Sequence, residues 1–384
     1  MALSEGRFAR FEGIEWWQQS LVADARVLVV GAGALGNEVI KNLALLGVGN
    51  ILVVDMDVVE RSNLTRSVLF RAGDEGEPKA ETAARMAGEI YPRIRAVPLV
   101  GNVLSDVGLG CFRWAQVVVG ALDNREARVF VNASCAQTGR AWVDGGIEVL
   151  SGIVRVFAPP ESACYECTMG QADWELLARR RSCSLLARRA LQEGGSPTTP
   201  TTASVIGGMQ AQEVLKRLHG LESLAGGGYI FEGLKHNSCS VRYPVSPECP
   251  WHESPPVIEA FEHWNCESTL REIWDWAEGR LGQLDAIDLS RELVESFRCP
   301  SCGEEVVVLE PIDRISAERA LCRRCGCEMG VRFLHSLRAD SAYLTLSPRQ
   351  LGLPMWDVLW ARGKEALLGI ELAGDRAAVL GVRA

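Results

Sequence analysis

The chain has 384 residues, of which 47% are hydrophobic and 23% charged, and these values argue against a disordered or fibrous protein. At roughly 150 residues per domain, the length predicts two or three domains. The formal charge of −9 argues against a non-specific nucleic-acid binder, which needs a clustered positive face. The sequence has no apolar run long enough for a membrane span, and its first residues lack the apolar segment of a signal peptide. We therefore expect a cytosolic protein in a reducing compartment, with neither nucleic acid nor a membrane as a partner.

Up to about residue 158 the sequence alternates apolar, strand-like runs with helical patterns. Residues 26–30, 50–55 and 115–122 are predicted strands, and residues 36–46 have the apolar spacing of a helix. Strands that are apolar throughout are typical of a parallel sheet with helices on both faces. The sequence therefore predicts an α/β fold with a Rossmann-like, doubly wound sheet.

Beyond residue 158 the composition and hydrophobic pattern of the sequence change at several points. Residues 159–202 are irregular and end in a stretch rich in Gly, Pro, Ser and Thr, which predicts a mobile loop. A helical pattern resumes at 202–220, and Glu253-Ser254-Pro255-Pro256 has the composition of a linker. We expect these parts: a first domain at 1–255 with a crossover loop at about 168–202, a helical region at 256–298, a four-cysteine module at 299–327 and a β-rich tail at 328–384.

A glycine motif follows the first predicted strand. Gly31, Gly33 and Gly36 form the pattern G-x-G-x-x-G where the helical spacing begins. Such glycines allow a tight turn and a close approach of the backbone to phosphate, which the helix N-terminus attracts. Asp55 ends the second predicted strand, where a carboxylate can accept the hydroxyls of a ribose. Taken alone, this motif is typical of a nicotinamide-dependent dehydrogenase.

Further polar residues argue against hydride transfer. A triphosphate with a metal ion needs cations and an extra carboxylate around it, whereas a nicotinamide site does not. Lysine binds phosphate as a point charge, arginine as a planar fork, and an aspartate at a strand end can hold Mg²⁺. Residues of these types follow the glycine motif in order: Asp57, Ser62-Asn63-Leu64-Thr65-Arg66, Pro78-Lys79-Ala80, Asp123-Asn124-Arg125 and Arg128.

In this combination the motifs resemble the adenylation domain of the ThiF/MoeB and ubiquitin-activating enzyme superfamily, over about residues 5–252. The resemblance implies ATP-dependent adenylation of the C-terminal glycine of a small β-grasp protein, either ubiquitin-like or a sulfur carrier. It also implies roles for matching residues. Asp55 would bind the ribose, Asp57 belongs to the same D-x-D motif, and the triphosphate and its Mg²⁺ would be bound by Asn63, Arg66, Lys79 and Asp123.

The N-terminal Arg7-Phe8-Ala9-Arg10 resembles the start of the same family's domain. In symmetric members the second arginine reaches the active site of the partner protomer, so Arg10 implies a homodimer. The chain departs from the family's pattern at Phe11 and Ser67, where the family usually has glutamine.

Two groups of cysteines predict zinc. Cys164 and Cys167 form a Cys-x-x-Cys pair, which in a reducing compartment indicates metal ligands more readily than a disulfide. A closed tetrahedral site needs two more ligands. In the family a second pair follows the long helix at the end of the domain, and Cys249 and His252 stand at the matching place. The resemblance therefore implies one structural site made of these four residues, with Cys239 as a competing fourth ligand.

The second group lies nearer the C-terminus. Cys299, Cys302, Cys322 and Cys325 have the spacing of a zinc ribbon, and a glycine follows each pair, as a tight knuckle requires. Cys327 could take the place of Cys325. A redox function for the two Cys-x-x-Cys pairs is an alternative, but two matched pairs have a simpler common purpose. The sequence therefore predicts two structural zinc ions per chain.

Cys183 is the candidate nucleophile. It lies in the sequence RRRSCSLLARR, between the Cys-x-x-Cys knuckle and the next long helix, which resembles the placement of the thioester cysteine in ubiquitin-activating enzymes. Cationic neighbours lower the pKa of a thiol, and the thiolate would attack the acyl-adenylate and release AMP. Cys266 is a weaker rival, whereas Cys111 and Cys135 fit a packing role.

Four functions follow from these patterns. The leading one is activation of a ubiquitin-like protein through adenylation and a thioester, with a conjugating enzyme as a possible further partner. The alternatives are an adenylyltransferase that activates a sulfur carrier without a thioester, an inactive scaffold that binds a ubiquitin-like protein, and a dehydrogenase. In the tail, Trp356 and Trp360 have helical spacing and fit core packing, with a docking surface as the alternative.

Overall fold

The computed structural model describes residues 6–180, 197–364 and 366–381. These residues form two compact units, each of which is discontinuous in sequence. Within the described ranges, no helix combines the length and the apolarity that crossing a bilayer requires. The first unit takes the described residues of Met1–Val103, Phe112–Thr168 and Gly195–Pro255, and the second those of Leu104–Cys111, Met169–Gly194 and Pro256–Ala384.

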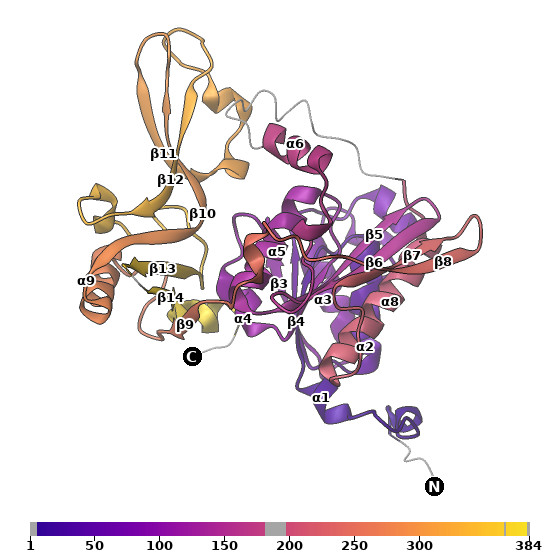
Figure 1. Ribbon diagram of the computed structural model, residues 1–384. Coiled ribbons are helices and arrows are strands. Elements are labelled where there is room, and N and C mark those ends of the chain that lie inside the picture. The colour runs from indigo at the N-terminus through magenta and orange to yellow at the C-terminus, as the bar shows by residue number, and fades with distance from the viewer. Residues whose placement is uncertain (1–5, 181–196, 365, 382–384) are drawn as a thin grey trace. The chain divides into compact units, whose positions relative to one another are not determined.

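The first unit is built on an eight-stranded sheet with the order β3-β2-β1-β4-β5-β6-β7-β8 (Figure 1). The strands from β3 to β5 are parallel, and those from β5 to β8 are antiparallel. The predicted α/β class is confirmed, and the parallel half has the expected doubly wound arrangement. The strands are β1 (Arg26–Val30), β2 (Asn50–Asp55), β3 (Arg95–Val100), β4 (Val117–Gly120), β5 (Ala141–Glu148), β6 (Ser151–Phe157), β7 (Gly227–Glu232) and β8 (Asn237–Arg242).

Helices cover this sheet, and two of them begin at side-chain caps. Asn124 caps α5 by accepting a hydrogen bond from the backbone N–H of Ala127, and Thr199 caps α8, which has Pro200 in its first turn. The α-helices are α1 (Gln19–Ala23), α2 (Ala34–Leu46), α3 (Lys79–Ile90), α4 (Leu109–Trp114, of which only residues 112–114 belong to this unit), α5 (Arg125–Thr138) and α8 (Pro200–Leu218), and the 3₁₀ helices are η1 (Ala9–Phe11), η2 (Arg61–Thr65), η3 (Ala72–Asp74), η4 (Glu166–Thr168) and η5 (Pro250–His252).

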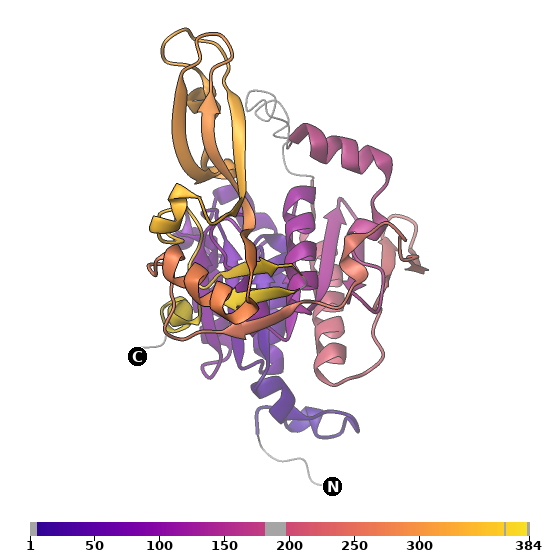
Figure 2. The same cartoon turned by 60° about the vertical axis from the view of Figure 1, so that its left-hand side comes forward.

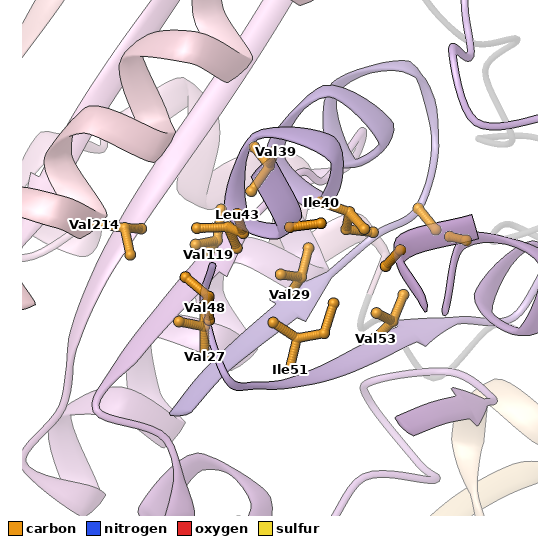
Figure 3. Close-up of a cluster of buried hydrophobic side chains, with 14 of the residues drawn as sticks. Val27, Val29, Val39, Ile40, Leu43, Val48, Ile51, Val53, Val119 and Val214 are labelled. Carbon is orange, nitrogen blue, oxygen red and sulfur yellow. The ribbon is translucent and has the colours of Figure 1, made fainter. Parts of the chain in front are cut away.

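The core of the first unit explains why its central strands are apolar throughout. The strand β1 lies in the middle of the sheet, and its four valine and leucine residues 27–30 are buried. Figure 3 shows Val27 and Val29 of this strand against Ile51 and Val53 of β2, with Ile40 of α2 packed over them. Burial of such side chains stabilises the folded chain by about 1.5–3 kcal/mol each relative to full exposure. The core thereby fixes the edge of the sheet at which the polar motifs emerge.

The second unit has its own sheet, with the order β11-β10-β13-β14-β9 and with β12 paired to β10. The strands β10, β11 and β12 continue as a long ribbon beyond the rest of that sheet in both views (orange in Figures 1 and 2). Its elements are α6 (Gln171–Arg180), β9 (Val257–Ala260), α9 (Leu270–Leu281), β10 (Leu284–Arg298), β11 (Glu305–Pro311), η6 (Ile312–Arg314), η7 (Ala317–Ala320), β12 (Gly330–Leu337), η8 (Ala342–Thr345), β13 (Val358–Gly363), β14 (Leu367–Glu371), η9 (Ala373–Asp375) and α10 (Arg376–Val379).

The prediction of a helical region at 256–298 was wrong for more than half of that range. Only α9 is an α-helix there, and residues 284–298 form the 15-residue strand β10. The register of this strand shifts between Val294 and Ser296, so its buried residues do not alternate regularly. A bulge of this kind disguises the two-residue period of a strand in the sequence. Trp356 and Trp360 are buried, as core packing predicted, but Trp360 belongs to β13 and the two are not on a helix.

A short segment of the N-terminal half belongs to the second unit. Residues 104–111 follow β3, and their backbone is bound by two buried residues of the second unit. Arg291 donates hydrogen bonds to the carbonyls of Leu104, at 2.8 Å, and Val107, at 3.0 Å. The carboxylate of Asp357 accepts one from the backbone N–H of Leu109 at 3.0 Å. These contacts satisfy backbone groups that burial would otherwise leave without partners.

Candidate nucleotide and metal sites

The glycine motif forms a turn between β1 and α2 whose backbone is packed too tightly for side chains at two positions. A Cβ atom on Gly31 would lie 2.3 Å from the carbonyl oxygen of Ala121, and Gly31 also has a positive φ of 99°. A Cβ atom on Gly36 would lie 1.9 Å from the carbonyl oxygen of Gly31. At Gly33, by contrast, a Cβ atom would meet nothing within 4 Å. The open space beside Gly33, at the N-terminus of α2, fits the close approach of a phosphate group.

Asn37 fixes the shape of this turn. Its side chain is completely buried, and its amide nitrogen donates to the carbonyls of Ala32, at 2.7 Å, and Gly33, at 3.1 Å. Its amide oxygen accepts a hydrogen bond from the backbone N–H of Leu69 at 2.8 Å. Asn37 therefore joins the glycine turn to the segment that follows Arg66. The sequence analysis missed this residue, although one asparagine among the apolar residues of a predicted buried helix was a signal for it.

Asp55 and its neighbours lie at the carboxyl end of β2. The carboxylate of Asp55 accepts hydrogen bonds from the backbone N–H groups of Ala32, at 2.7 Å, and Asp57, at 2.8 Å. Burial raises the pKa of the Asp55 carboxyl group, although these two hydrogen bonds act in the opposite direction. Asp57 pairs with Lys79, whose Nζ lies 2.8 Å from the carboxylate. The structure therefore brings Asp55, Asp57, Lys79 and the glycine turn together.

Asn63 and Arg66 lie in and directly after η2. The amide oxygen of Asn63 accepts a hydrogen bond from the backbone N–H of Glu60 at 2.9 Å, and only 7% of the residue is exposed. Arg66 is half-buried and donates to the carbonyl of Ser62 at 3.0 Å. Asn63 thus has a structural task in this loop, and the recorded side-chain bond of Arg66 is to the backbone of the same loop.

Asp123 emerges beyond the carboxyl end of β4. Because β2, β1 and β4 are parallel neighbours, this end lies at the same edge of the sheet as Asp55 and the glycine turn. Asp123 is exposed, and the side-chain amide of Asn124 donates to its carboxylate at 3.1 Å. Exposed carboxylates of this kind, beside a place where phosphates can sit, fit the oxygen ligands that Mg²⁺ prefers.

The first group of possible zinc ligands is assembled as the resemblance implied. Cys164, Cys167, Cys249 and His252 offer four donor atoms that all lie within 4.8 Å of one another. The sulfurs of Cys164 and Cys249 are 3.5 Å apart, and Nε2 of His252 lies 3.0 Å from the sulfur of Cys167. The other ring nitrogen of His252 faces the carbonyl of Pro160 at 3.4 Å, as is usual for a zinc-bound imidazole. Cys239 is exposed on β8 and outside this group, so the alternative that made it a ligand was wrong.

The second group lies in the ribbon of the second unit. The donor atoms of Cys299, Cys302, Cys322 and Cys325 also lie within 4.8 Å of one another. Three of their sulfur–sulfur distances are 3.4, 3.5 and 3.8 Å. Thiolates placed tetrahedrally at 2.3 Å from a zinc ion are about 3.8 Å apart, so four thiolates here fit a closed structural site. Cys327 is exposed and outside the group.

The family model described as the ThiF family matches residues 7–251. The chain belongs to the ThiF family. This match covers the glycine turn, the residues at the carboxyl edge of the sheet and three of the four ligands in the first cysteine group.

Relatives of this ThiF domain carry two kinds of name. The SAMP-activating enzyme E1 of Haloferax volcanii is 32% identical over 240 residues, which is 60% of this chain and 82% of that protein. The sulfur carrier protein adenylyltransferase of Thermus thermophilus is 33% identical over 238 residues, which is 60% of this chain and 83% of that protein. The Nedd8-activating enzyme E1 catalytic subunit of Drosophila melanogaster is 36% identical over 178 residues, or 43% of this chain. The chain spans only 38% of the length of that last relative.

The fold of the ThiF domain is also found among solved structures. The structure of E. coli MccB with ATP has a TM-score of 0.55 and 20% sequence identity, and covers 66% of this chain and 75% of that chain. At this identity the likeness shows a shared fold, which agrees with the mixed eight-stranded sheet.

Among the candidate nucleophiles of this ThiF protein, Cys183 lies outside the described residues. Its rival Cys266 is 1% exposed and bonded through its backbone N–H to Asp375 at 2.8 Å. Burial raises the pKa of the Cys266 thiol, which disfavours the thiolate. Cys111 and Cys135 are buried as predicted, and burial raises the pKa of Cys111 to about 12.

Arg10 of the ThiF domain is not placed with the nucleotide-site residues. It is exposed in η1 and makes no hydrogen bond or ion pair with the rest of the described chain. The neighbouring Arg7 donates to the carbonyl of Ile90, the last residue of α3, at 2.7 Å. Lys79 begins the same helix, and a helix of this length spans roughly 17 Å. Within one chain, therefore, the segment that carries Arg10 is bound to the end of α3 that is far from Lys79.

Proposed function

We propose that this ThiF protein uses ATP to adenylate the C-terminal glycine of a ubiquitin-like or sulfur-carrier protein. The observation that carries the proposal is the set of groups at one edge of the sheet: the open backbone at Gly33, the half-buried carboxylate of Asp55, the Lys79–Asp57 pair and the exposed carboxylate of Asp123. A dehydrogenase has no use for the last two of these. Relatives named as E1 enzymes and as adenylyltransferases support the same reaction.

Each of these residues has a definite task in the proposed reaction. Asp55 accepts hydrogen bonds from the ribose hydroxyls. The backbone at Gly33 and the N-terminus of α2 contact phosphate, and Lys79 and Arg66 neutralise its charge. Asp123 holds Mg²⁺. Bound ATP supplies the AMP group, which is transferred to the carrier's carboxylate as pyrophosphate leaves. The Lys79 ammonium is held in place by Asp57, so it does not have to be reoriented when negative charge develops.

Pyrophosphate exchange tests this proposal. With a carrier protein that ends in glycine, the wild type should exchange labelled pyrophosphate into ATP in the presence of Mg²⁺. Asp123→Asn should lose the exchange, because the triphosphate charge is no longer neutralised at the reacting phosphate. The exposed Glu75 offers a matched control, and Glu75→Gln should exchange normally. Unchanged exchange in Asp123→Asn would remove Asp123 from the site.

For the step after adenylation we propose a thioester at Cys183. The thiolate attacks the acyl carbon of the adenylate, the bond to AMP breaks, and the carrier's glycine is left on sulfur, ready for a conjugating enzyme. The basic sequence around Cys183 and the Nedd8-activating relatives favour this step, while the sulfur-carrier relative favours an enzyme that stops at the adenylate. On a non-reducing gel, the wild type should form an adduct that thiols cleave and Cys183→Ala should not. Normal exchange without any wild-type adduct would establish the sulfur-carrier alternative, whereas carrier binding without exchange would indicate a scaffold.

We also propose that the protein acts as a homodimer in which Arg10 serves the site of the partner protomer. Its distance from Lys79 within one chain supports this arrangement. Arg10→Ala and Asp123→Asn should each be inactive alone, because each lacks one half of every site. Mixing and re-equilibrating them should restore about a quarter of the wild-type exchange, through mixed dimers with one complete site. No recovery, in a sample shown to contain mixed dimers, would contradict this role for Arg10.

The two cysteine groups would hold structural zinc. Each has four protein donors, which leaves no open position for water or substrate. The first group joins residues 164–167 to residues 249–252, and so holds together two segments that are distant in sequence. The second would give the tip of the ribbon its folding free energy, since such a small module has little core of its own.

A further inference from the structure

A fully buried carboxylate lies next to the nucleotide edge of the sheet and has no task in the function proposed above. Asp144 of β5 is 0% exposed and lies between two arginines. One carboxylate oxygen accepts a hydrogen bond from Nε of Arg128, on α5, at 3.0 Å. The other accepts from Nε of Arg155, on β6, at 2.9 Å and also from its Nη2. A buried carboxylate with both oxygens bonded to guanidinium groups is a rigid anchor for those groups.

Arg128 makes a second set of contacts through another nitrogen of its guanidinium group. Its Nη2 donates to the carbonyl of Leu122 at 2.5 Å and to that of Gly145 at 3.1 Å. Leu122 directly precedes Asp123, the proposed ligand of Mg²⁺. Arg128 therefore connects the buried Asp144 to the backbone of the loop that presents Asp123.

The same loop is fixed from its other side by the start of α5. The side chain of Asn124 accepts a hydrogen bond from the backbone N–H of Ala127 at 2.8 Å and donates one to the carboxylate of Asp123 at 3.1 Å. Asn124 orients the Asp123 carboxylate, while Arg128 fixes the backbone that carries it. Since the Asp123 side chain itself is exposed, its position depends on these two neighbours.

Arg155 holds Asp144 but, among the described residues, makes no hydrogen bond to the loop that carries Asp123. Its guanidinium group lies over the rings of Tyr165, at 4.9 Å, and Phe157, at 5.7 Å. Burial lowers the pKa of Arg155, but the carboxylate of Asp144, together with the nearby Tyr165 and Tyr243, acts in the opposite direction and the net effect raises the pKa. Arg155 and Arg128 are thus two charged partners of the same carboxylate, but only Arg128 also donates a hydrogen bond to the carbonyl of Leu122.

We propose that Asp144 and Arg128 are positioning residues that set the place of Asp123 and thereby the affinity for the metal ion of the metal–nucleotide complex. This inference rests on the proposed function in one respect only, which is that Asp123 binds the metal. It explains the order of residues in Asp123-Asn124-x-x-x-Arg128: one helical turn brings the arginine back over the loop that precedes the helix. The arginine acts through the loop backbone and does not contact the nucleotide.

Two matched substitutions test the proposal. Arg128→Lys and Arg155→Lys both keep a cation beside Asp144, and both lose the guanidinium fork. Only Arg128→Lys loses the bond to the Leu122 carbonyl. Binding of Mn²⁺ to the protein with a non-hydrolysable ATP analogue, followed by electron paramagnetic resonance, should weaken roughly tenfold in Arg128→Lys, as loss of one charged hydrogen bond implies. Arg155→Lys should stay within about twofold of wild type, since its contacts do not include the loop.

Stability and nucleotide binding separate positioning from general damage. Both variants should unfold in urea at similar concentrations, and both should bind the metal-free nucleotide like wild type. Asp144→Asn, which keeps the shape of the side chain, should weaken Mn²⁺ binding as Arg128→Lys does. Equal weakening in Arg128→Lys and Arg155→Lys, or none in Arg128→Lys and Asp144→Asn, would overturn the proposal. Because the measurement does not require turnover, a wild type without pyrophosphate exchange would refute the proposed function and leave this test intact.

Discussion

The glycine turn allows folding and nucleotide binding to be separated by two substitutions of the same kind. Gly36→Ala places a Cβ atom 1.9 Å from the carbonyl oxygen of Gly31, and a backbone carbonyl group cannot move aside as a flexible side chain can. Overpacking of this kind costs typically about 1–3 kcal/mol of stability, and a clash with backbone belongs at the upper end. Gly33→Ala meets nothing within 4 Å, and Gly33 has φ −72° and ψ −159°, which an alanine can approach. Its stability should therefore change by less than about 1 kcal/mol.

Nucleotide binding should show the opposite sensitivity at Gly33. A methyl group there fills the space in which we expect phosphate to approach the N-terminus of α2. Loss of one charge-assisted hydrogen bond from the backbone corresponds to a roughly 10- to 100-fold weaker Kd for ATP. Urea unfolding and calorimetric titration with ATP and Mg²⁺ measure the two quantities on the same preparations. A Gly33→Ala protein of normal stability that binds ATP as wild type does would refute the placement of phosphate at this turn.

Other expectations concern zinc, a buried ion pair and pH. By elemental analysis, Cys249→Ser should lower the zinc content from two ions per chain to about one, whereas the control Cys239→Ser should keep both. Retention of two ions in Cys249→Ser would exclude Cys249 as a ligand. Arg291→Met should cost about 3–5 kcal/mol in urea unfolding of the second unit, because the carboxylate of Asp357, 3.6 Å from the guanidinium group, stays buried with its charge uncompensated. A cost below about 1 kcal/mol would show that Asp357 is neutralised otherwise. Because burial raises the pKa of Asp55, ionisation of Asp55 disfavours the folded state. Relative to that of Asp55→Asn, the free energy of unfolding of the wild type should therefore be highest below about pH 4. It should fall as the pH rises through the pKa that Asp55 has in the folded protein. A difference that does not change with pH would contradict the shift.

The parts of the site that follow from the sequence are those that a local motif encodes. A strand followed by a glycine turn and a helix has only one common geometry, so the motif itself places Gly31 and Gly36 where backbone contacts exclude a side chain. The same geometry places Asp55 at the end of the neighbouring strand β2. The cysteine pairs were equally clear, since two knuckles at zinc-ribbon spacing have few other uses.

The residues that the sequence analysis missed depend on tertiary neighbours. Asn37 binds the backbone of Leu69, 32 residues later, and Asp144 joins an arginine from α5 to one from the antiparallel strand β6. Nothing in the local sequence of β5 indicates that its aspartate is buried. The helical interpretation of 284–298 failed for a related reason, since the bulge in β10 gives a pattern of buried positions that periodicity alone assigns to a helix.

The assignment of residues 104–111 to the second unit determines how the protein can be dissected. Cleavage by a protease at the proline linker after Glu253 divides the covalent chain into two stretches, but these stretches do not correspond to the two folded units. The N-terminal stretch would still carry Leu104, Val107 and Leu109, whose backbone groups complete the bonding of Arg291 and Asp357 in the other one. The C-terminal stretch expressed by itself would have to fold around two buried charged residues that lack those partners. Fragments made by nicking at this linker should therefore remain associated on a sizing column, and independent expression of the C-terminal part should require residues 104–111 to be supplied as a peptide.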